Sequence, residues 1–434
     1  MARLHSFTLE NFRSYKRGTL NLGTLTLLVG ANASGKSNLI EGLQMLSWLA
    51  RGQRLEDVFR AVQEKELSVR GVPAQLARDG WSEFSFSCHL RQTEWEALSV
   101  TIRHNGSGLR IAKERMEAQG VKVPLYDVRR RTGDHGHDLH VAYNNFSIGG
   151  IKPEILCTDQ QAVFTQLLTP ARFEAKHKRA QATIPQACRG FMESLANVFF
   201  LDPIPQRMRN PSFADDAKLR GDGANLSSVL CGLSKDEPKK GAVLDFIKDL
   251  PEQHITGFDF LRGPRNEVLV LLEELFGPTK TERDASLLSD GTLRVLAVAA
   301  ALLSAPEYST VVMEEVDNGI HPSRARALLA KVQDVAEKRK LAVLITSHNP
   351  ALLDSLPNSA VPDVVFCYRD PKEGDSRLVR LEDLPNYPEL IAQGPLGRLV
   401  TQGVLDRMVK QAQTPDERRA SGLAYVEQLR QAQP

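Results

Sequence analysis

The chain has 434 residues, which is enough for one large α/β domain with an insertion or for two to three domains. Its 55 Lys and Arg residues nearly balance 53 Asp and Glu residues, so the net charge of +2 excludes a global attraction to nucleic acid. Five scattered cysteines without a CxxC pair indicate reduced thiols rather than a disulfide framework or a zinc site.

Nothing in the sequence indicates export or membrane insertion. The N-terminus lacks a signal-peptide pattern, and the longest apolar run, residues 295–303, is too short to cross a bilayer. We therefore expect a cytoplasmic protein with no membrane association.

The first fifty residues are predicted to form strands, a glycine-bearing loop and a helix. Short apolar runs at 5–9, 20–22 and 25–29 indicate strands, and apolar residues over 38–48 have helical spacing. Between them lies GANASGKS, from Gly30 to Ser37, which fits the pattern G-x-x-x-x-G-K-[ST]. A strand, loop and helix in this order direct several backbone N–H groups and a helix N-terminus at one anion. The sequence therefore predicts a binding site for the phosphates of a nucleoside triphosphate.

Residues of this loop have separate expected roles. Two glycines supply unusual dihedral angles and close backbone approach, a lysine adds positive charge for the terminal phosphates, and Ser37 can give its hydroxyl to Mg²⁺. We expect ATP to be bound by Gly30, Asn32, Ser34, Gly35, Lys36, Ser37 and Asn38.

The middle and end of the chain contain other predicted elements. Apolar and polar residues alternate over 83–146, which predicts an antiparallel sheet beside the nucleotide-binding core. A basic helical stretch follows at 171–198, where Pro185 should break or kink the helix. Strand and helix candidates alternate over 199–280. Apolar runs at 310–313 and 341–346 predict parallel strands, 363–382 predicts a hairpin, and the last fifty residues predict amphipathic helices and a charged tail.

A second motif, LSDGT at 288–292, precedes an apolar helix. Ser289 is well placed as the N-cap of that helix, with the first-turn N–H groups facing outward. Taken alone, the motif is equally consistent with an ordinary capped core helix.

Two predicted strands end in residues suited to catalysis. The run VVMEEVD ends a buried strand with Glu314 and Glu315, and burying two acids is costly unless they meet a cation or a polarised water. One carboxylate can hold a metal's water shell while the next orients or deprotonates an attacking water. The following strand ends at His348, whose side chain can reach a γ-phosphate.

In this order, the phosphate loop, LSDG, the acid pair and the histidine resemble the ABC-type ATPase superfamily. The closer similarity is to the soluble SMC/RecF/OLD-like branch, through LHSFTLENFRSYKRGTLNLGTLTLLVGANASGKSNLIEGL, SLLSDGTLRVLAVAAALL, VVMEEVDNGIHPSRARALL and LITSHNPALLDSL. The chain also looks like stand-alone ATPases of bacterial phage-defence operons. This resemblance covers about residues 1–50 and 285–370.

The resemblance implies an α/β fold of the ABC-type P-loop NTPase head: a mixed sheet with helices, an antiparallel β subdomain and an inserted α+β or helical region. We expect an N-terminal ATPase lobe at 1–165, the inserted region at 166–280, a C-terminal ATPase lobe at 281–385 and a helical tail at 386–434.

The resemblance also implies residue roles. Glu314 would occupy the metal-side acid position, Glu315 the general-base position and His348 that of the switch histidine. Gln161, in CTDQQAVF, would be the loop glutamine that senses Mg²⁺, with its neighbour Gln160 as the alternative. The remaining expected contacts to the nucleotide or between two copies come from Ser289, Gly291, Asp317 and Arg13.

Two residues depart from the family pattern. Glu314 stands where Asp is commonest, although Glu-Glu also occurs in the OLD-like branch, and Thr292 stands where many members have Gln. The longer acid could shift the Mg²⁺ geometry and slow turnover.

The resemblance implies a head-to-tail homodimer around two Mg-ATP, with hydrolysis to ADP and phosphate through Glu315. It also implies that this cycle controls nucleic acid or a partner effector, such as a nuclease or toxin, in a role such as anti-phage defence.

Three alternatives stay open. An OLD-like nuclease is disfavoured because only about fifty residues follow the hairpin, too few for a usual domain. A transporter subunit is disfavoured by the long interval between GKS and LSDG. A slow, ATP-gated scaffold fits the same motifs.

Two weaker patterns have ordinary explanations. His135, His137 and His140 have spacing that could ligate a metal, but their glycine- and aspartate-rich surroundings favour an exposed loop. Basic groups that could contact DNA or RNA phosphates, or simply be solvated, are Arg129–Arg131, the run 176–179, Arg207, Arg209, Lys218 and Arg220.

Overall fold

A six-stranded sheet forms the centre of the molecule. The computed structural model describes residues 2–64, 67–106, 108–131, 137–248, 254–317, 322–384 and 387–410. The first five strands in the sheet order are parallel to one another, and the last is antiparallel. In spatial order they are β10 (Phe199–Leu201), β15 (Thr310–Glu314), β16 (Ala342–Ser347), β3 (Leu25–Val29), β17 (Val365–Arg369) and β18 (Ser376–Arg380).

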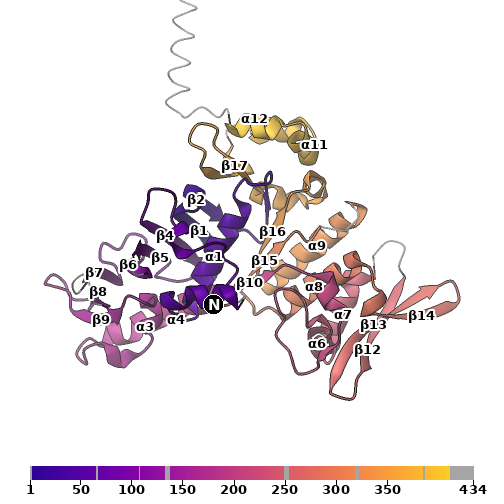
Figure 1. Cartoon of the computed structure of the whole chain (residues 1–434), viewed down its shortest axis with the longest axis horizontal. Helices are drawn as coiled ribbons and strands as arrows, with labels where there is room; N and C mark the ends of the chain where they lie inside the picture. Colours follow the sequence, from indigo (N-terminus) through magenta and orange to yellow (C-terminus); the bar gives the residue numbers. More distant parts are fainter. Residues whose placement is uncertain are drawn as a thin grey trace, which may run out of the picture.

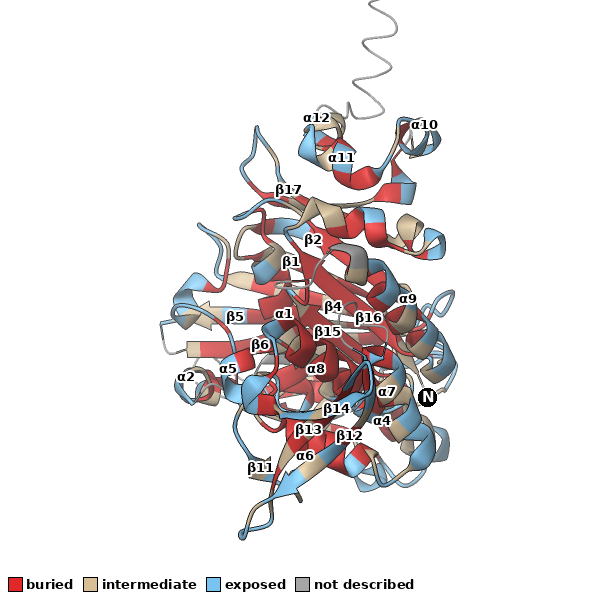
Figure 2. Ribbon diagram, turned by 90° about the vertical axis from the view of Figure 1, so that its right-hand side faces the viewer, coloured by how far each residue is buried: buried red, intermediate tan, exposed pale blue. Residues whose placement is uncertain are grey.

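The central strands are continuously apolar because both faces of their sheet are covered. Every residue of β3 is buried, and its side chains are divided between two hydrophobic cores, one on each face of the sheet. Leu28 packs in the core that contains α1 (Lys36–Ala50) and α4 (Lys178–Ala196). Leu27 packs in the core that contains α8 (Asp290–Ser304) and α9 (Pro322–Arg339). Figure 2 shows these buried strands between their covering layers.

An eight-stranded antiparallel sheet lies beside this core. The expected sheet at 83–146 is confirmed, and it is extended by the N-terminal hairpin and by one further strand. Gly42 on α1 allows close contact with this sheet, because a Cβ there would lie 3.2 Å from Leu9 and Phe86. In spatial order the strands are β2 (Tyr15–Asn21), β1 (Arg3–Phe12), β4 (Glu83–Arg91), β5 (Ala97–Asn105), β6 (Gly108–Glu117), β7 (Tyr126–Arg131), β8 (Asp138–Tyr143) and β9 (Glu154–Thr158). The small helices α2 (Val58–Gln63) and α3 (Val163–Gln166) belong to the same lobe.

A third, four-stranded sheet lies on the other side of the central sheet (Figure 1). One of its faces packs on α6 and α7, and Ser227 Oγ on α6 accepts a hydrogen bond from Val270 N at 3.0 Å. Its elements are β11 (Ser212–Phe213), β13 (Glu267–Phe276), β12 (Ile255–Arg262), β14 (Thr279–Asp284), α5 (Pro205–Met208), α6 (Leu226–Leu233) and α7 (Glu237–Ile247).

Of the two expected effects of Pro185, a break or a kink, the break does not occur. The helix α4 runs through Pro185 without interruption. A proline inside a helix forfeits one backbone hydrogen bond, at a cost of about 3 kcal/mol. Burial of Ile184, Cys188 and Phe191 against the core offsets that loss.

The C-terminal elements are short. The expected hairpin at 363–382 is confirmed by β17 and β18. It is followed by α10 (Tyr387–Ala392), α11 (Leu396–Thr401) and α12 (Val404–Lys410), and the charged tail lies outside the described residues. No helix in the described ranges has the length and apolar character needed to span a bilayer. The expected domain limits stay a prediction, although β10, from within 166–280, adds directly to the central sheet.

One buried carboxyl group joins the antiparallel sheet to α3. Glu114 on β6 is fully buried and accepts hydrogen bonds of 2.7 Å from Tyr126 Oη, Val163 N and Phe164 N. These bonds favour the ionised form, but burial outweighs them and raises the pKa of Glu114 to about 7.

The raised pKa of Glu114 predicts a loss of stability as the pH rises. The folded state binds a proton that the unfolded chain releases near pH 4.5, so stability falls between about pH 5 and pH 7. The expected loss is about 3 kcal/mol for a shift of this size. Denaturant unfolding of the full chain at pH 5 and pH 8 should show this slope, and Glu114→Gln should lack that part of it. An identical slope in both proteins would contradict the prediction.

Candidate functional site

The loop after β3 is a cradle whose walls come from distant parts of the chain. A Cβ on Gly30 would lie 2.2 Å from the backbone oxygen of Cys367 on β17. Gly35 has φ of +119°, and a Cβ there would lie 2.3 Å from Ser376 Oγ on β18. The loop therefore needs glycine at both positions, for close approach at Gly30 and for backbone conformation as well at Gly35.

The polar groups of the loop fit a phosphate ligand. Lys36 Nζ donates to the backbone oxygens of Gly30 at 2.6 Å and Ala31 at 3.1 Å, and burial lowers its pKa. Ser34 Oγ is buried without a hydrogen-bond partner. Asn32 and Ser37 are exposed, the latter in the first turn of α1. A phosphate oxygen would give the lysine ammonium and the loop amides a stronger, charged partner.

A network that the sequence reasoning did not find surrounds the first turns of α1. Glu41, one turn beyond Ser37, is buried and forms ion pairs with Arg13, at 3.2 Å, and with Arg70. Arg70 Nη2 also donates to Asn38 Oδ1 at 2.9 Å, and Asn38 Nδ2 donates to Ser14 Oγ at 2.7 Å. Two of the expected nucleotide contacts, Arg13 and Asn38, are thus tied to this network beside the loop.

The acid pair and the histidine meet at the carboxyl edge of the central sheet. Glu314 ends β15, and burial, reinforced by Asp202 and Glu315, raises its pKa to about 7. Glu315 has φ of +47°, which turns the chain out of the strand. Its Oε1 lies 3.5 Å from Nδ1 of His348, just past the end of β16. The structure therefore brings together the three residues that the sequence assigned to metal, base and switch positions.

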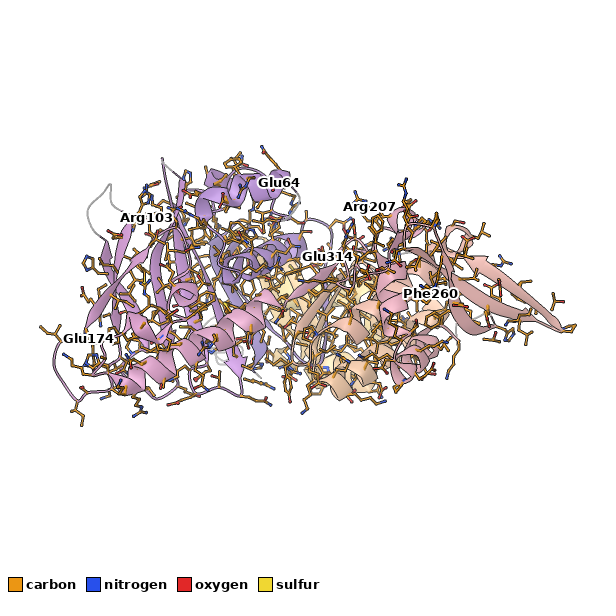
Figure 3. The ribbon with its side chains drawn as sticks, turned by 90° about the horizontal axis from the view of Figure 1, so that it is seen from below. Glu64, Arg103, Glu174, Arg207, Phe260 and Glu314 are labelled. Carbon is orange, nitrogen blue, oxygen red and sulfur yellow. The ribbon has the colours of Figure 1, made fainter. Side chains whose placement is uncertain are left out.

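A cavity of about 620 Å³ lies between the first turns of α1 and Glu314. Its lining includes Ser37, Glu41, Arg70 and Glu314. Figure 3 shows Glu314 between the two lobes, which are marked by Glu64 and Arg207. The hydroxyl of Ser37 and the carboxyl of Glu314 are oxygen donors of the kind that Mg²⁺ prefers.

Gln161 does not lie at this site. Its Nε2 donates to the backbone oxygen of Gly52 at 2.6 Å, just beyond the C-terminal end of α1. Helix α1 has 15 residues, so its two ends are about 22 Å apart. The alternative, Gln160, is buried beside Asp159. The structure therefore contradicts the expected role of Gln161, because this residue lies at the end of α1 that is remote from Ser37.

Asp202 is the acid that the sheet order places there instead. β10 pairs with β15 in parallel, with Leu201 opposite Met313, so Asp202 and Glu314 leave adjacent strands side by side. Burial and the neighbouring Glu315 raise the pKa of Asp202. The run FFLDP has the pattern of a short apolar strand that ends in an acid, which could have indicated Asp202. The position of this strand next to β15 could not be predicted from the sequence.

The LSDG motif has the expected local structure. Ser289 caps α8, accepting a hydrogen bond from Thr292 N at 3.1 Å, and Gly291 is buried in the first turn. Arg209 fixes the motif from outside, donating to Asp290 Oδ1 at 2.6 Å and to Leu288 O at 2.9 Å. This helix end belongs to the core on the opposite face of the central sheet from α1.

Asp317 points into its own chain. It is buried and accepts a hydrogen bond of 2.8 Å from Ser347 Oγ. Its expected role between two copies is not visible in this arrangement, and the residues that follow it lie outside the described ranges.

The weaker sequence candidates have ordinary surroundings. His137 contacts Asp159 at 3.1 Å and His140 contacts Glu154 at 3.1 Å, while His135 is outside the described residues. The described ranges contain no group of three or more His, Cys, Asp or Glu residues that could hold a metal. Several basic candidates are ion-paired: Arg129 with Asp127, Lys176 with Glu174, Arg207 with Asp222, Arg209 with Asp290, and Arg220 with Asp216.

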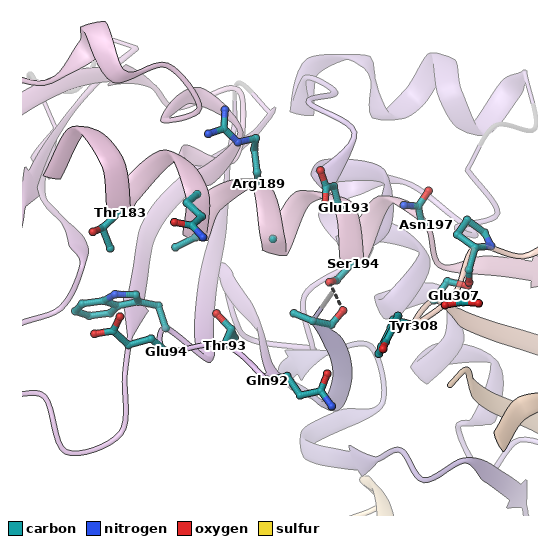
Figure 4. A pocket seen from close by; sticks show the side chains of 17 residues that line it. Gln92, Thr93, Glu94, Thr183, Arg189, Glu193, Ser194, Asn197, Glu307 and Tyr308 are labelled. Carbon is teal, nitrogen blue, oxygen red and sulfur yellow. Dashed lines mark hydrogen bonds between the residues drawn. The ribbon is translucent and has the colours of Figure 1, made fainter. Parts of the chain in front are cut away.

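A larger cavity, of about 800 Å³, lies away from this edge of the sheet. It is formed by α4, the β4–β5 loop and the segment before β15 (Figure 4). Its polar lining includes Gln92, Glu94, Glu193 and Glu307, and Ser194 Oγ donates to Ala2 O at 2.9 Å. None of the candidate nucleotide-binding residues lines it.

Two family models match the chain, and they divide it as the motifs do. Residues 3–67 match "AAA ATPase domain", and residues 164–354 match "AAA domain, putative AbiEii toxin, Type IV TA system". The first contains the phosphate loop and the second contains LSDG, the acid pair and His348. Both models are described as AAA-type ATPase domains, and the mixed central sheet with its antiparallel neighbour agrees with the expected α/β fold class.

The chain is also similar to curated proteins over short segments. The DNA replication and repair protein RecF of Clostridioides difficile (strain 630) is 32% identical over 133 residues, which cover 30% of this chain and 29% of RecF. RecF of Gloeobacter violaceus (strain ATCC 29082 / PCC 7421) is 44% identical over 69 residues, 16% of each protein. The matched segments thus span less than a third of these relatives. A crystal structure of an Smc head bound to the C-terminal winged helix domain of ScpA aligns over 87% of this chain and 97% of its own, with 11% identity and a TM-score of 0.48.

The crowding at Gly30 predicts that the ATPase domain does not tolerate a methyl group there. Because the clash is with a backbone carbonyl, Gly30→Ala should lower the free energy of unfolding by about 1–3 kcal/mol or distort the loop so that nucleotide binding fails. Gly190→Ala on α4 is the matched control, since a Cβ there meets nothing within 4 Å and helix propensity favours alanine. Wild-type stability and nucleotide binding in Gly30→Ala would contradict the prediction.

Proposed function

We propose that this chain is an ATPase that closes around two Mg-ATP as a head-to-tail homodimer. The supporting observation is that the phosphate loop, Glu314, Glu315 and His348 share one edge of the central sheet while Ser289 caps a helix in the opposite core. One copy therefore provides only half of the phosphate contacts. LSDG of a second copy would supply the other half.

Each residue has a role in this proposal. Lys36 and the loop amides hold the phosphates, and Ser37 with Glu314 holds the metal and its water shell. Bound Mg²⁺ would neutralise phosphate charge. Glu315 orients or deprotonates the attacking water, and His348, 3.5 Å away, positions the Glu315 carboxylate. Asp202, beside Glu314, adds a second carboxylate to the metal side of the site.

A slow, ATP-gated scaffold is the second candidate, and one observation favours it. The pKa of Glu314 is raised to about 7, so in the absence of a cation this carboxyl group is substantially protonated at neutral pH. A metal position that must first lose a proton would slow each turnover. Steady-state phosphate release separates the two: sustained release indicates an ATPase cycle, and a single stoichiometric event indicates a scaffold.

The physiological role is proposed from the relatives. The description of the model that matches 164–354 names a putative AbiEii toxin and a type IV toxin–antitoxin system. This description supports a role linked to a toxin or nuclease, as in anti-phage defence. Similarity to RecF supports DNA as an alternative target. The ion pairs of Arg207, Arg209 and Arg220 disfavour DNA binding at that patch.

The dimer proposal predicts different behaviour for three variants. Lys36→Ala should weaken nucleotide binding by about 100-fold, because it removes two charge-assisted hydrogen bonds of about 1.5 kcal/mol each. Glu315→Gln should bind ATP and sediment as a stable dimer. Ser289→Asp keeps a helix cap but opposes the phosphates with a negative charge, so it should bind nucleotide and stay monomeric. Binding is measured with a fluorescent ATP analogue, and the oligomeric state by analytical ultracentrifugation. If Glu315→Gln remains monomeric with saturating ATP, the dimer proposal is wrong.

The proposed role of Asp202 predicts a change in metal dependence rather than in folding. Asp202→Asn should require several-fold more Mg²⁺ for tight nucleotide binding, while binding in excess EDTA stays unchanged. Asp216→Asn is the matched control, since Asp216 lies between β11 and α6, away from the acid pair, and forms a partly exposed ion pair with Arg220. An Mg²⁺ titration identical in wild type, Asp202→Asn and Asp216→Asn would remove Asp202 from the site and leave the ATPase proposal intact.

A further inference from the structure

Strand β13 carries apolar residues on both faces, yet the helices of this part of the chain pack on only one of them. Its sequence is EVLVLLEELF, and Val268, Val270 and Leu272 are buried against the helix layer. Leu269, Leu271 and Leu275 point the other way, and the last is 39% exposed. A strand with water on one side normally alternates apolar and polar residues. The pattern of β13 is instead that of a strand buried on both sides.

Neighbouring strands extend this apolar surface. Leu261 on β12 is paired with Leu269 and is 47% exposed. Phe213 on β11 is paired with the adjacent residue Glu267 and is 59% exposed. Paired residues of antiparallel strands share a face. We call the surface made by Phe213, Leu261, Leu269, Leu271 and Leu275 the outer face.

The outer face is only partly buried: Leu269 packs at the edge of the core, Leu271 is half-buried, and Leu261, Phe213 and Leu275 are exposed. The helices that pack against β12 and β13 are α6 and α7, which lie on the buried side with Val270 and Leu272. Figure 1 shows these helices between the strands and the rest of the molecule, with the β13–β14 hairpin projecting away.

The other large sheet of the protein shows what a solvated face looks like here. On β4 and β5 the residues that alternate with the buried ones include Ser85, Ser87, Ser99 and Thr101. The same chain thus places small polar residues on one open sheet face and leucines on the other. Clustered exposed apolar residues with a polar rim are typical of protein interaction sites.

The charges around the outer face specify the kind of partner. The acids that share it by strand pairing are Asp259, Glu267, Glu273, Glu282 and Asp284. The paired cation on this face is Lys280, bound to Glu273 at 2.9 Å. This acidic rim opposes nucleic acid and anionic lipid, and two copies meeting face to face would bring acids against acids.

We infer that the outer face binds a basic amphipathic segment of a partner protein, whose apolar side covers the leucines and whose Lys or Arg residues meet the acidic rim. The hairpin of β13 and β14 leads through residues 285–287 directly to Ser289, so the partner would sit within a few residues of the LSDG motif. The inference does not depend on nucleotide binding or hydrolysis.

Three synthetic peptides of equal length test the inference on the full chain: a helical Leu/Lys repeat, a helical Leu/Glu repeat and a Ser/Lys repeat. Binding is followed by fluorescence anisotropy. The Leu/Lys peptide should bind at least ten-fold more tightly than either of the others. Leu261→Ser with Leu271→Ser should weaken that binding at least ten-fold, and so should Glu267→Lys with Glu282→Lys.

Glu94→Lys with Glu307→Lys is the matched control, because both acids are exposed and lie at the opposite cavity. Circular dichroism and denaturant unfolding confirm that each variant is folded. Equal binding of the Leu/Lys peptide to control and face variants would overturn the inference. So would preferred binding of the Leu/Glu peptide or of phosphatidylserine vesicles. Sedimentation that shows a dimer lost in Leu261→Ser with Leu271→Ser would assign the face to a second copy instead.

Discussion

The parallel alignment of four strands, β10, β15, β16 and β3, is the constraint on which the candidate site depends. Parallel strands end at one common edge, so Asp202, Glu314, Ser347 and the phosphate loop emerge together although the sequence separates them by hundreds of residues. The carboxyl groups of Asp202 and Glu314 lie close together and are partly shielded from solvent, and this burial raises the pKa of both. The same crowding that makes the acids costly makes a cation favourable there.

Local features of the site were predictable from sequence because short-range chemistry determines them. The phosphate loop, the Ser289 cap and the strand that ends in Glu314 all depend on neighbours within a few residues. The antiparallel sheet at 83–146 was predictable for the same reason, since its strands pair with their sequence neighbours.

Features that depend on long-range pairing were not predictable. Gln161 follows β9 of the antiparallel sheet, so it lies beside Gly52 rather than beside the acids. Arg70 and Glu41 belong to no sequence motif, and only the folded chain places them beside Ser37. The break expected at Pro185 did not occur because helix propensities do not include the buried contacts that keep α4 continuous.

The position of β3 in the central sheet also affects how this protein can be made. β3 lies between β16 and β17, which are synthesised about 310 to 340 residues later. On the ribosome, the apolar strand that carries the phosphate loop therefore stays without either neighbour while about 310 further residues are synthesised. Contacts so distant in sequence slow folding, and an unpaired apolar strand is exposed to aggregation in the meantime. Nascent chains that stop before β17 and β18 would also lack the walls at Gly30 and Gly35. The phosphate loop can thus take its folded form only after β17 and β18 have been synthesised.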